Sequence, residues 1–355
     1  MKGDRNKKKV LLISHEMTYT GAPRSLFFLH DILQEMGYVV LVWSLKAGPF
    51  LEKYTKAKCE VKVIGFPECI SDKLAEEIST YDLVIANTVF GAAFARYASQ
   101  YTKTILWLRE AENISEIIHN CALNALDILY SKDIICVSEY ARSAIQSFCP
   151  LSNIHVIHNY IPDRGRISFN LVIKQKIKFI VSGTIEVRKQ QHIAIEAYQM
   201  MPLELKEICE LHIVGDRAEW SAAYWKPLIK NIPEGIIWHE RIDNDNELYT
   251  LYNQMNVFIV PSLDESCSLV ALEAAMLGKA LLISDKVGAK YLIADDDYIF
   301  KHGDVQELSR KMCYLTSRKK LLSQGLKMRQ AYLREGTKKQ YKKALRRTLK
   351  NFAKI

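Results

Sequence analysis

The stretch VFIVPSLDESCSLVALEAAMLGKALLI, residues 257–283, predicts a strand, a loop, a helix and a second strand. The strands are the apolar runs 257–260 and 280–283, and the helix ends at Gly278. In a parallel sheet this order places the N-terminus of the helix at the carboxyl edge of the strands. Free N–H groups and the positive end of the helix dipole make such a terminus a good site for a diphosphate.

Two carboxylates flank this helix terminus. Glu265 precedes it, and Glu273 follows eight residues later. Because like charges repel, neither carboxylate suits a phosphate, and both suit hydroxyl groups on either side of it. A ribose on one side and a sugar on the other fit this pattern. The alternative is an ordinary turn before a helix, with two solvated glutamates.

The rest of the chain repeats the alternation of apolar strands and helical patterns. Continuous apolar strands separated by helices indicate parallel sheets that are covered on both faces. Turn formers interrupt the alternation near residues 158–172. We therefore expect an α/β chain of two Rossmann-like, doubly wound domains facing each other across a cleft. They occupy residues 1–160 and 173–330, and a basic amphipathic helix follows at 331–355. The predicted strands are 10–14, 39–44, 61–64, 83–87, 104–108, 134–137, 155–157, 179–182, 211–214, 236–239, 257–260, 281–284 and 298–300, and the predicted helices include 24–36, 191–201, 246–255 and 305–315.

Composition points to a globular protein. At 355 residues the chain exceeds the ~250–300 that one hydrophobic core usually serves. No apolar run approaches the ~18 residues of a membrane span, and only a short apolar run follows the basic start before Ser14, His15 and Glu16. The eight cysteines form no CxxC pair, and Cys267 has no neighbouring base to make it a nucleophile. We expect a cytoplasmic protein.

The net charge of +9 is concentrated at the C-terminus. Residues 337–355 hold eight Lys or Arg and no acid, so the body is nearly neutral and no nucleic-acid-binding core is expected. Tyr341, Leu345, Leu349 and Phe352 recur at helical spacing and make this tail amphipathic. The tail either packs on the body through this stripe or contacts an anionic membrane surface or a partner.

The glutamate motif, followed by Ala274-Ala-Met-Leu-Gly278 and an apolar strand, resembles that of the retaining glycosyltransferases of family 4. These have the GT-B fold of two Rossmann-like domains. Other segments match in order from about residue 9 to about 320, and they are 20–23 (TGAP), 182–189 (SGTIEVRK), 214–216 (VGD), 287–289 (VGA) and 302–304 (HGD).

The resemblance implies a set of donor-site residues. Lys189, with Arg188 beside it, would neutralise the diphosphate, and such fixed cations are worth roughly 3 kcal/mol or more of barrier. An ordinary surface pair is the alternative. Glu265 would contact the donor sugar and Glu273 the ribose. The remaining donor-site residues that the resemblance implies are Gly21 and Ala22, Gly183 and Thr184, Ile242 near the base, and Ser268, Leu269 and Val270 through their N–H groups. For Gly21, a tight turn is the alternative to close approach of the phosphates.

The chain also departs from the family pattern. Thr184 stands where many members have an arginine, so Arg188 and Lys189 would neutralise the diphosphate alone. After strand 104–108 many members have a histidine, whereas this chain has Arg109 and Glu110. Glu110 or Arg109 is the candidate to replace it, although the leaving phosphate itself could take the acceptor proton. Asp295-Asp-Asp297 is interpreted as a solvated turn, and no cofactor or obligatory metal is expected.

The resemblance thus implies retaining transfer of a hexosyl group from a nucleotide-sugar donor to a glycan or lipid-linked acceptor, in cell-surface polysaccharide or glycolipid synthesis. The basic tail would hold the protein at the inner face of the membrane. Nucleotide-sugar epimerisation would need a further acid–base constellation that the sequence lacks. A catalytically silent GT-B protein that binds a partner or scaffolds a complex is the alternative from a different class.

Overall fold

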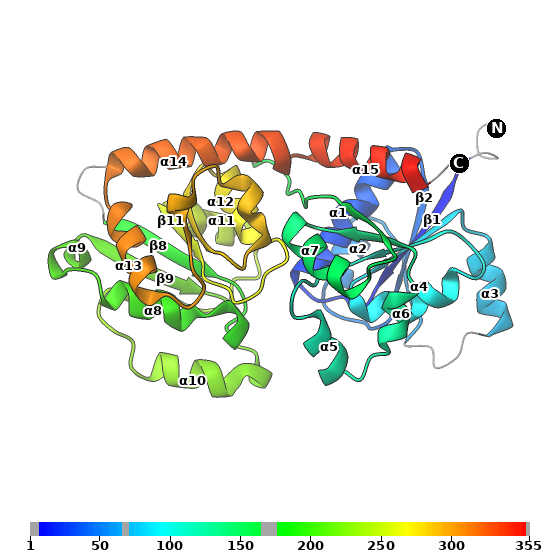
Figure 1. The fold of residues 1–355 in the computed structure, drawn as a ribbon, viewed down its shortest axis with the longest axis horizontal. Coiled ribbons are helices and arrows are strands. Elements are labelled where there is room, and N and C mark those ends of the chain that lie inside the picture. The colour runs from blue at the N-terminus through cyan, green and yellow to red at the C-terminus, as the bar shows by residue number, and fades with distance from the viewer. Residues whose placement is uncertain (1–6, 66–70, 165–175, 353–355) are drawn as a thin grey trace. The chain divides into compact units, whose positions relative to one another are not determined.

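The structure is a computed structural model that describes residues 7–65, 71–164 and 176–352. The chain forms two compact units. The first unit comprises Met1–Asn159 and Tyr341–Ile355, and the second comprises Tyr160–Gln340. Residues 165–172, part of the predicted break in the alternation at 158–172, lie outside the described residues, as do residues 173–175. Each unit is a parallel sheet with helices on both faces (Figure 1).

The first unit is built on a seven-stranded sheet of order β3-β2-β1-β4-β5-β6-β7, and every neighbouring pair in it is parallel. Leu11 and Ile13 of β1 contribute to a core on one face that also buries Trp43 and Leu106. The strands are β1 (Lys9–Ser14), β2 (Val39–Ser44), β3 (Val61–Val63), β4 (Leu83–Asn87), β5 (Thr104–Trp107), β6 (Asp133–Cys136) and β7 (Asn153–Val156). The helices are α1 (Gly21–Glu35), α2 (Leu51–Lys56), α3 (Asp72–Ser79), α4 (Ala92–Ala98), α5 (Ile114–Asn120), α6 (Ala125–Leu129) and α7 (Glu139–Phe148), with the short η1 (Val89–Gly91).

The second unit repeats this plan in a six-stranded parallel sheet of order β10-β9-β8-β11-β12-β13. Residues 257–283 form β11, α12 and most of β12, as predicted. The strands are β8 (Ile177–Ser182), β9 (Cys209–Val214), β10 (Ile236–His239), β11 (Val257–Val260), β12 (Ala280–Ser284) and β13 (Ile299–Phe300). The helices are α8 (Gln191–Gln199), α9 (Leu203–Glu207), α10 (Ala222–Lys230), α11 (Asp245–Gln254), α12 (Leu269–Met276), α13 (Val305–Tyr314) and α14 (Arg318–Ala331), with the short helical segments η2 (Val187–Lys189), η3 (Glu219–Ser221), η4 (Gly288–Leu292), η5 (Asp296–Tyr298) and η6 (Tyr332–Gly336).

The strand order reverses once in each sheet. In the first sheet the chain moves from β3 back past β1 to β4, and in the second from β10 back past β8 to β11. The loops after the two strands at such a point diverge and leave a crevice at the carboxyl edge, where ligands bind in doubly wound sheets. The fold thus confirms the predicted α/β class and marks β1/β4 and β8/β11 as the places to look for a site.

The last helix, α15 (Lys338–Phe352), returns the chain to the first unit (Figure 1). Its apolar stripe is buried: Leu345 is fully enclosed, and the Tyr341 ring stacks on Trp107 with 6.2 Å between centroids. Lys342 reaches Glu35 at the end of α1 at 3.4 Å. Packing through the stripe, one of the two readings of the tail, is confirmed. Lys354 lies outside the described residues.

Helices long and apolar enough to cross a bilayer are absent from the described ranges.

Candidate active site

The loops after β8 and β11 meet at the point of strand reversal in the second unit. Gly183 follows β8 with a φ of 139°, a conformation that side chains disfavour. Gly215, after the neighbouring β9, packs against it so closely that a Cβ there would lie 1.7 Å from the Gly183 carbonyl oxygen. The two glycines therefore let the β8 and β9 loops run together at the edge of the sheet.

A four-residue charge cluster occupies this edge. Lys189 Nζ forms an ion pair with Glu265 Oε2, and Arg188 Nη1 donates to the same oxygen at 3.2 Å. Arg188 also donates to the Asp264 carbonyl oxygen at 2.9 Å and to Glu186 Oε1 at 2.7 Å. The structure thus brings together three of the predicted site residues, Arg188, Lys189 and Glu265, from two different loops.

The electrostatics of the cluster keep Glu265 ionised. Burial alone would raise the pKa of Glu265, but the charges of Lys189 and Arg188 lower it to about 2. The Glu265 side chain is 15% exposed and that of Lys189 20%. Because two cations face two carboxylates here, the cluster is formally neutral. A diphosphate bound beside the cluster would compete with Glu265 for Lys189 or Arg188. The positive end of the α12 dipole would also stabilise the diphosphate.

Backbone hydrogen bonds hold the cluster in place. Glu265 forms a parallel bridge with Val287, in which its N–H donates to the Lys286 carbonyl at 3.0 Å and its carbonyl accepts from the Gly288 N–H at 2.8 Å. The Leu263 N–H donates to the Arg188 carbonyl at 2.8 Å, which ties the β11 loop to the β8 loop. The VGA segment at 287–289 therefore helps to hold Glu265 in position.

Helix α12 begins beside Glu265. Ser268 is its N-cap, and the Ser268 hydroxyl accepts from the Ala271 N–H at 3.2 Å. Ser268 adopts a φ of 70°, which is rare for a residue with a side chain and which clusters at functional sites. The predicted residues Leu269 and Val270 form the first turn, where N–H groups lack intrahelical acceptors.

Glu273 lies on α12 at 1% exposure. Its Oε1 accepts from the Tyr249 hydroxyl of α11 at 3.1 Å, and the Arg164 guanidinium lies 4.0 Å from the centre of the Tyr249 ring. For Glu273 to contact a ribose, the Tyr249 side chain or the residues around it would have to move. Tyr249 was not predicted as a site residue, because a tyrosine on an amphipathic helix looks like an ordinary core residue.

Polar groups of the β8 loop add to the site. The Thr184 carbonyl accepts from Gln191 Nε2 at 2.9 Å. Gln190 takes a left-handed φ of 51°, and among the described residues neither the Gln190 nor the Gln191 side-chain oxygen has a hydrogen-bond partner, although both are buried. Buried acceptors are usually hydrogen-bonded, so these two oxygens could accept from a bound ligand or water. Sequence reasoning overlooked both, because glutamine at the start of a helix is common.

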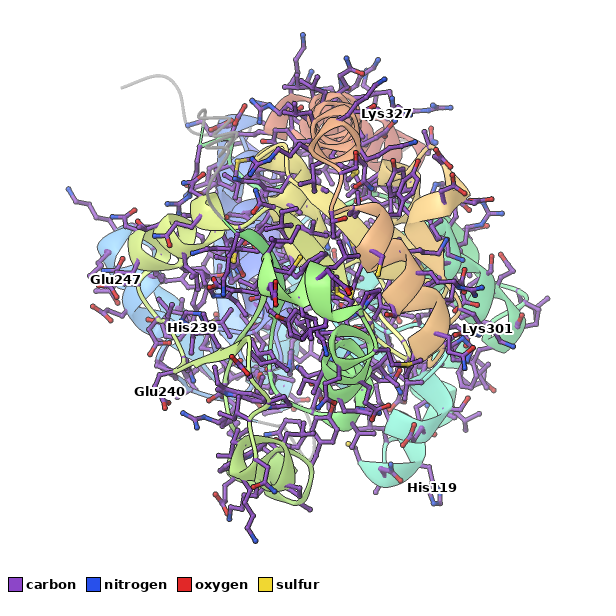
Figure 2. The ribbon with its side chains drawn as sticks, turned by 90° about the vertical axis from the view of Figure 1, so that its left-hand side faces the viewer. His119, His239, Glu240, Glu247, Lys301 and Lys327 are labelled. Atoms are coloured by element: carbon purple, nitrogen blue, oxygen red, sulfur yellow. The ribbon has the colours of Figure 1, made fainter. Side chains whose placement is uncertain are left out.

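The predicted base-side residue Ile242 is half-buried in the loop after β10. Its neighbour Arg241 pairs with Asp243 at 2.6 Å and with Asp216 at 3.3 Å, which joins this loop to the VGD segment after β9. His239, the last residue of β10, and Glu240, which follows it, are labelled in Figure 2. The contacts place Ile242 at the same carboxyl edge as the charge cluster, two strands further along the sheet.

The predicted residues of the first unit lie at the start of α1. Gly21 and Ala22 are its first two residues, and the Ala22 carbonyl accepts from Asn87 Nδ2 at 3.2 Å. Gly21 has helical backbone and is not among the glycines with positive φ.

Glu110 and Arg109 are engaged within the first unit. Glu110 is buried, burial raises its pKa, and its Oε2 accepts from the Arg109 N–H at 2.9 Å and the Val89 N–H at 3.1 Å. Arg109 donates to Asn87 at 2.9 Å and to Asn159 at 2.7 Å. These hydrogen bonds stabilise the loops at the carboxyl edge of the first sheet, and the replacement of a histidine by either residue stays a prediction.

Asp295 and Cys267, the remaining groups considered from the sequence, have local contacts. Asp295 caps η5 by accepting from the Asp297 N–H at 3.0 Å. Cys267 is buried with its sulfur 3.6 Å from the Tyr291 hydroxyl. In the three described ranges no group of three or more His, Cys, Asp or Glu is arranged to hold a metal ion.

Residues 163–339 match the family described as glycosyl transferases group 1, and residues 6–147 match glycosyl-transferase family 4. The chain belongs to the family of glycosyl transferases group 1. This confirms the resemblance that the glutamate motif indicated.

The curated relatives are mannosyltransferases. O-antigen chain mannosyltransferase B of Escherichia coli is 24% identical over 190 residues, which is 50% of this chain and 50% of that protein. The serotype-specific mannosyltransferase WbdA of Escherichia coli is 30% identical over 144 residues, 38% of this chain and 17% of WbdA. The matched regions thus span half or less of these curated relatives.

Solved structures share the fold. Anabaena Alr3699/HepE, crystallised with UDP and glucose, aligns with a TM-score of 0.77 at 17% identity and covers 97% of this chain and 99% of HepE. The lipopolysaccharide outer core galactosyltransferase WaaB aligns with a TM-score of 0.71 at 14% identity, over 98% of this chain and all of WaaB. The chain therefore has the GT-B fold.

Proposed function

We propose that this protein transfers a hexosyl group from a nucleotide-sugar donor to a hydroxyl of a glycan or lipid-linked acceptor, with retention at the anomeric carbon. The product belongs to a cell-surface polysaccharide or glycolipid. The observation that carries the proposal is the pairing of Lys189 and Arg188 with an ionised Glu265 beside the tip of α12, at the strand reversal of the second sheet.

This arrangement supplies what the departure of a nucleoside diphosphate requires. As the glycosidic bond breaks, negative charge grows on the phosphate, and Lys189, Arg188 and the N–H groups of Leu269 and Val270 can stabilise it. Glu265 is repelled by the phosphate and instead accepts hydrogen bonds from hydroxyls of the sugar. The leaving phosphate can take the acceptor proton on the same face, which fits the absence of a dedicated base from the charge cluster. We propose no resident metal.

The curated relatives suggest the sugar. Because the matched Escherichia coli proteins are mannosyltransferases, one of them of the O-antigen chain, we propose mannose as the first donor sugar to test. The UDP and glucose in HepE make UDP-glucose the second.

The test is nucleotide release from GDP-mannose, UDP-glucose and related donors, with an alkyl hexoside as acceptor. We expect Lys189→Ala and Glu265→Gln each to lower release at least 100-fold, because removal of one charge-stabilising group typically costs that much. Lys226→Ala and Glu247→Gln are matched controls, since both side chains are exposed in the same unit. Product stereochemistry by NMR tests retention.

No release from any donor, together with no donor binding by calorimetry, would instead favour a silent GT-B protein that binds a partner. Loss of activity in the two controls as well would show that the assay reports stability and not the site.

We also propose a peripheral position on an anionic membrane surface. With its apolar stripe buried, α15 offers only its charges, and its exposed cations are Lys338, Lys339, Lys343, Arg346, Arg347 and Lys350.

A further inference from the structure

The first unit has its own point of strand reversal, between β1 and β4, and the proposed donor residues leave it largely unused. His15 and Glu16 follow β1 directly, and Thr88 to Phe90 follow β4. By the general rule for doubly wound sheets, polar side chains at this edge are candidates for ligand contact. In the sequence His15 and Glu16 served only to end the first apolar run.

The His15 ring is packed in place, but its two nitrogens are not fully hydrogen-bonded within the described residues. Its ring stacks on Phe90 with 5.4 Å between centroids and a 17° tilt. Its Nδ1 is shielded from solvent and has no hydrogen-bond partner among the described residues. Its Nε2 lies 3.6 Å from Glu16 Oε1, beyond direct hydrogen-bond distance.

Glu16 is fixed beside His15. Its Oε1 accepts from the Thr18 hydroxyl at 2.6 Å, and that hydroxyl lies 2.9 Å from the Thr20 hydroxyl at the start of α1. Contact with His15 opposes the effect of burial and lowers the pKa of Glu16 to about 2, so the carboxylate is ionised. The pair therefore offers an imidazole nitrogen and an ionised carboxylate side by side, 3.6 Å apart, at this edge of the sheet.

The platform under His15 is strained. Thr88 has a φ of 71°, unusual for a β-branched residue, and within the described ranges its buried hydroxyl has no partner. The turn is kept in this conformation by the Thr88 N–H, which donates to the Trp107 carbonyl at 2.8 Å, and by the Val89 N–H, which donates to Glu110. Strain that surrounding bonds enforce next to an unsaturated polar pair is typical of a functional site.

We propose that His15 and Glu16 form a subsite for a sugar hydroxyl, which accepts from His15 Nε2 and donates to Glu16 Oε1. Phe90 and the strained Thr88 turn hold the imidazole in place, with Glu110 as a positioning residue. This subsite rests on the proposed function and deepens it. The hydroxyl belongs either to the donor sugar or to the acceptor, and the two sources give different kinetics.

The experiment compares His15→Ala, His15→Gln and Glu16→Gln with wild-type protein, using the donor that gives nucleotide release. If the hydroxyl is the donor's, His15→Ala lowers donor hydrolysis without acceptor tenfold or more. If it is the acceptor's, hydrolysis is unchanged while the KM for an alkyl hexoside rises tenfold or more. His15→Gln, whose amide can still donate, recovers part of the loss in either case.

His119→Ala is the matched control, because His119 is an exposed histidine of the same unit that projects from α5 (Figure 2). Equal melting temperatures for the variants show that folding is intact. Unchanged hydrolysis and unchanged acceptor KM in His15→Ala overturn the subsite. Should wild-type protein release no nucleotide at all, the proposed function fails, and the subsite is then tested alone by NMR titration of the His15 ring with methyl α-mannoside. No shift of that ring at tens of millimolar overturns it.

Discussion

At the scale of single residues, three of the five non-glycine residues with positive φ in the described ranges lie at the two points of strand reversal. Gln190 and Ser268 in the second unit and Thr88 in the first all have positive φ without being glycine. Each such residue costs of order 1–3 kcal/mol and persists because neighbouring bonds enforce it. The sequence gives no sign of this, since a serine, glutamine or threonine in a loop ordinarily has negative φ.

Ser268 allows the strain to be separated from the helix cap. Ser268→Ala removes the hydroxyl that accepts from Ala271 and keeps the strained Cβ, so we expect the free energy of unfolding to fall by about 1 kcal/mol. Ser268→Gly also loses the cap hydroxyl, but a glycine N-cap costs only a few tenths and relieves the positive φ. We expect it to be at least as stable as wild type in urea unfolding. Equal destabilisation by both would mean that the strain is absent in solution.

At the scale of elements, α11 and α12 are joined by a buried lysine. Lys279, just after α12, is 3% exposed, and its Nζ donates to the Asn253 carbonyl in the last turn of α11 at 2.7 Å. A cation at this end favours the helix dipole. Burial nevertheless lowers the pKa of Lys279 to about 8, because the charged form is poorly solvated there.

This shift predicts a pH dependence. Between pH 8 and the ordinary lysine value of about 10.4, the unfolded chain holds the Lys279 proton and the folded protein has released it. Stability from this group therefore rises with pH across that window, by up to about 3 kcal/mol. Lys279→Met should lack this gain, so its stability relative to wild type falls as pH rises from 8 to 10. Urea unfolding at both pH values measures it, and a constant difference between the two proteins would contradict the assignment.

At the scale of the whole molecule, the chain passes between the two units twice. Within each unit, contacts stabilise the segments on its side of both connections. In the first unit Arg109 binds Asn159 and lies 4.9 Å from the ring centre of Trp107, on which Tyr341 stacks. In the second unit the Tyr332 hydroxyl donates to the Ile161 carbonyl at 3.0 Å, and the Ile161 N–H donates to the Gly336 carbonyl at 3.3 Å. The C-terminal helix is therefore a structural part of the first unit as well as a carrier of charge.

The double role of α15 decides how membrane binding should be tested. Deleting the helix would expose the surface that Leu345 and Tyr341 cover and would destabilise the first unit by several kcal/mol. Substitution of Lys343, Arg346, Arg347 and Lys350 by glutamine removes four exposed charges and keeps the buried stripe. At about 1 kcal/mol per cation, vesicle affinity should fall more than 100-fold at low salt. Sedimentation with phosphatidylserine vesicles measures this.

An equal number of substitutions at exposed cations elsewhere, such as Lys226 and Lys327, serves as a control for net charge; Lys327 projects from the surface of α14 (Figure 2). Wild-type binding that does not weaken as salt rises would contradict an electrostatic contact.

The sequence by itself determined the elements and their class. Buried parallel strands must be apolar on both faces, so each predicted strand corresponds to a strand of the structure, and the glutamate motif identified the family before any coordinates. Its spacing also located the loop that carries Glu265 and the tip of α12.

Only the tertiary structure decided how the side chains pair. The ion pairs of Glu265 with Lys189 and Arg188 join residues about 76 positions apart, and the His15–Phe90 stack depends on β1 lying next to β4. Local sequence pattern records which side of a strand or helix is buried, but it does not record which loops the strand order brings together. For that reason Lys189, Arg188 and Glu265 could be named from the sequence, whereas their mutual neutralisation, the burial of Glu273 against Tyr249 and the subsite at His15 could not.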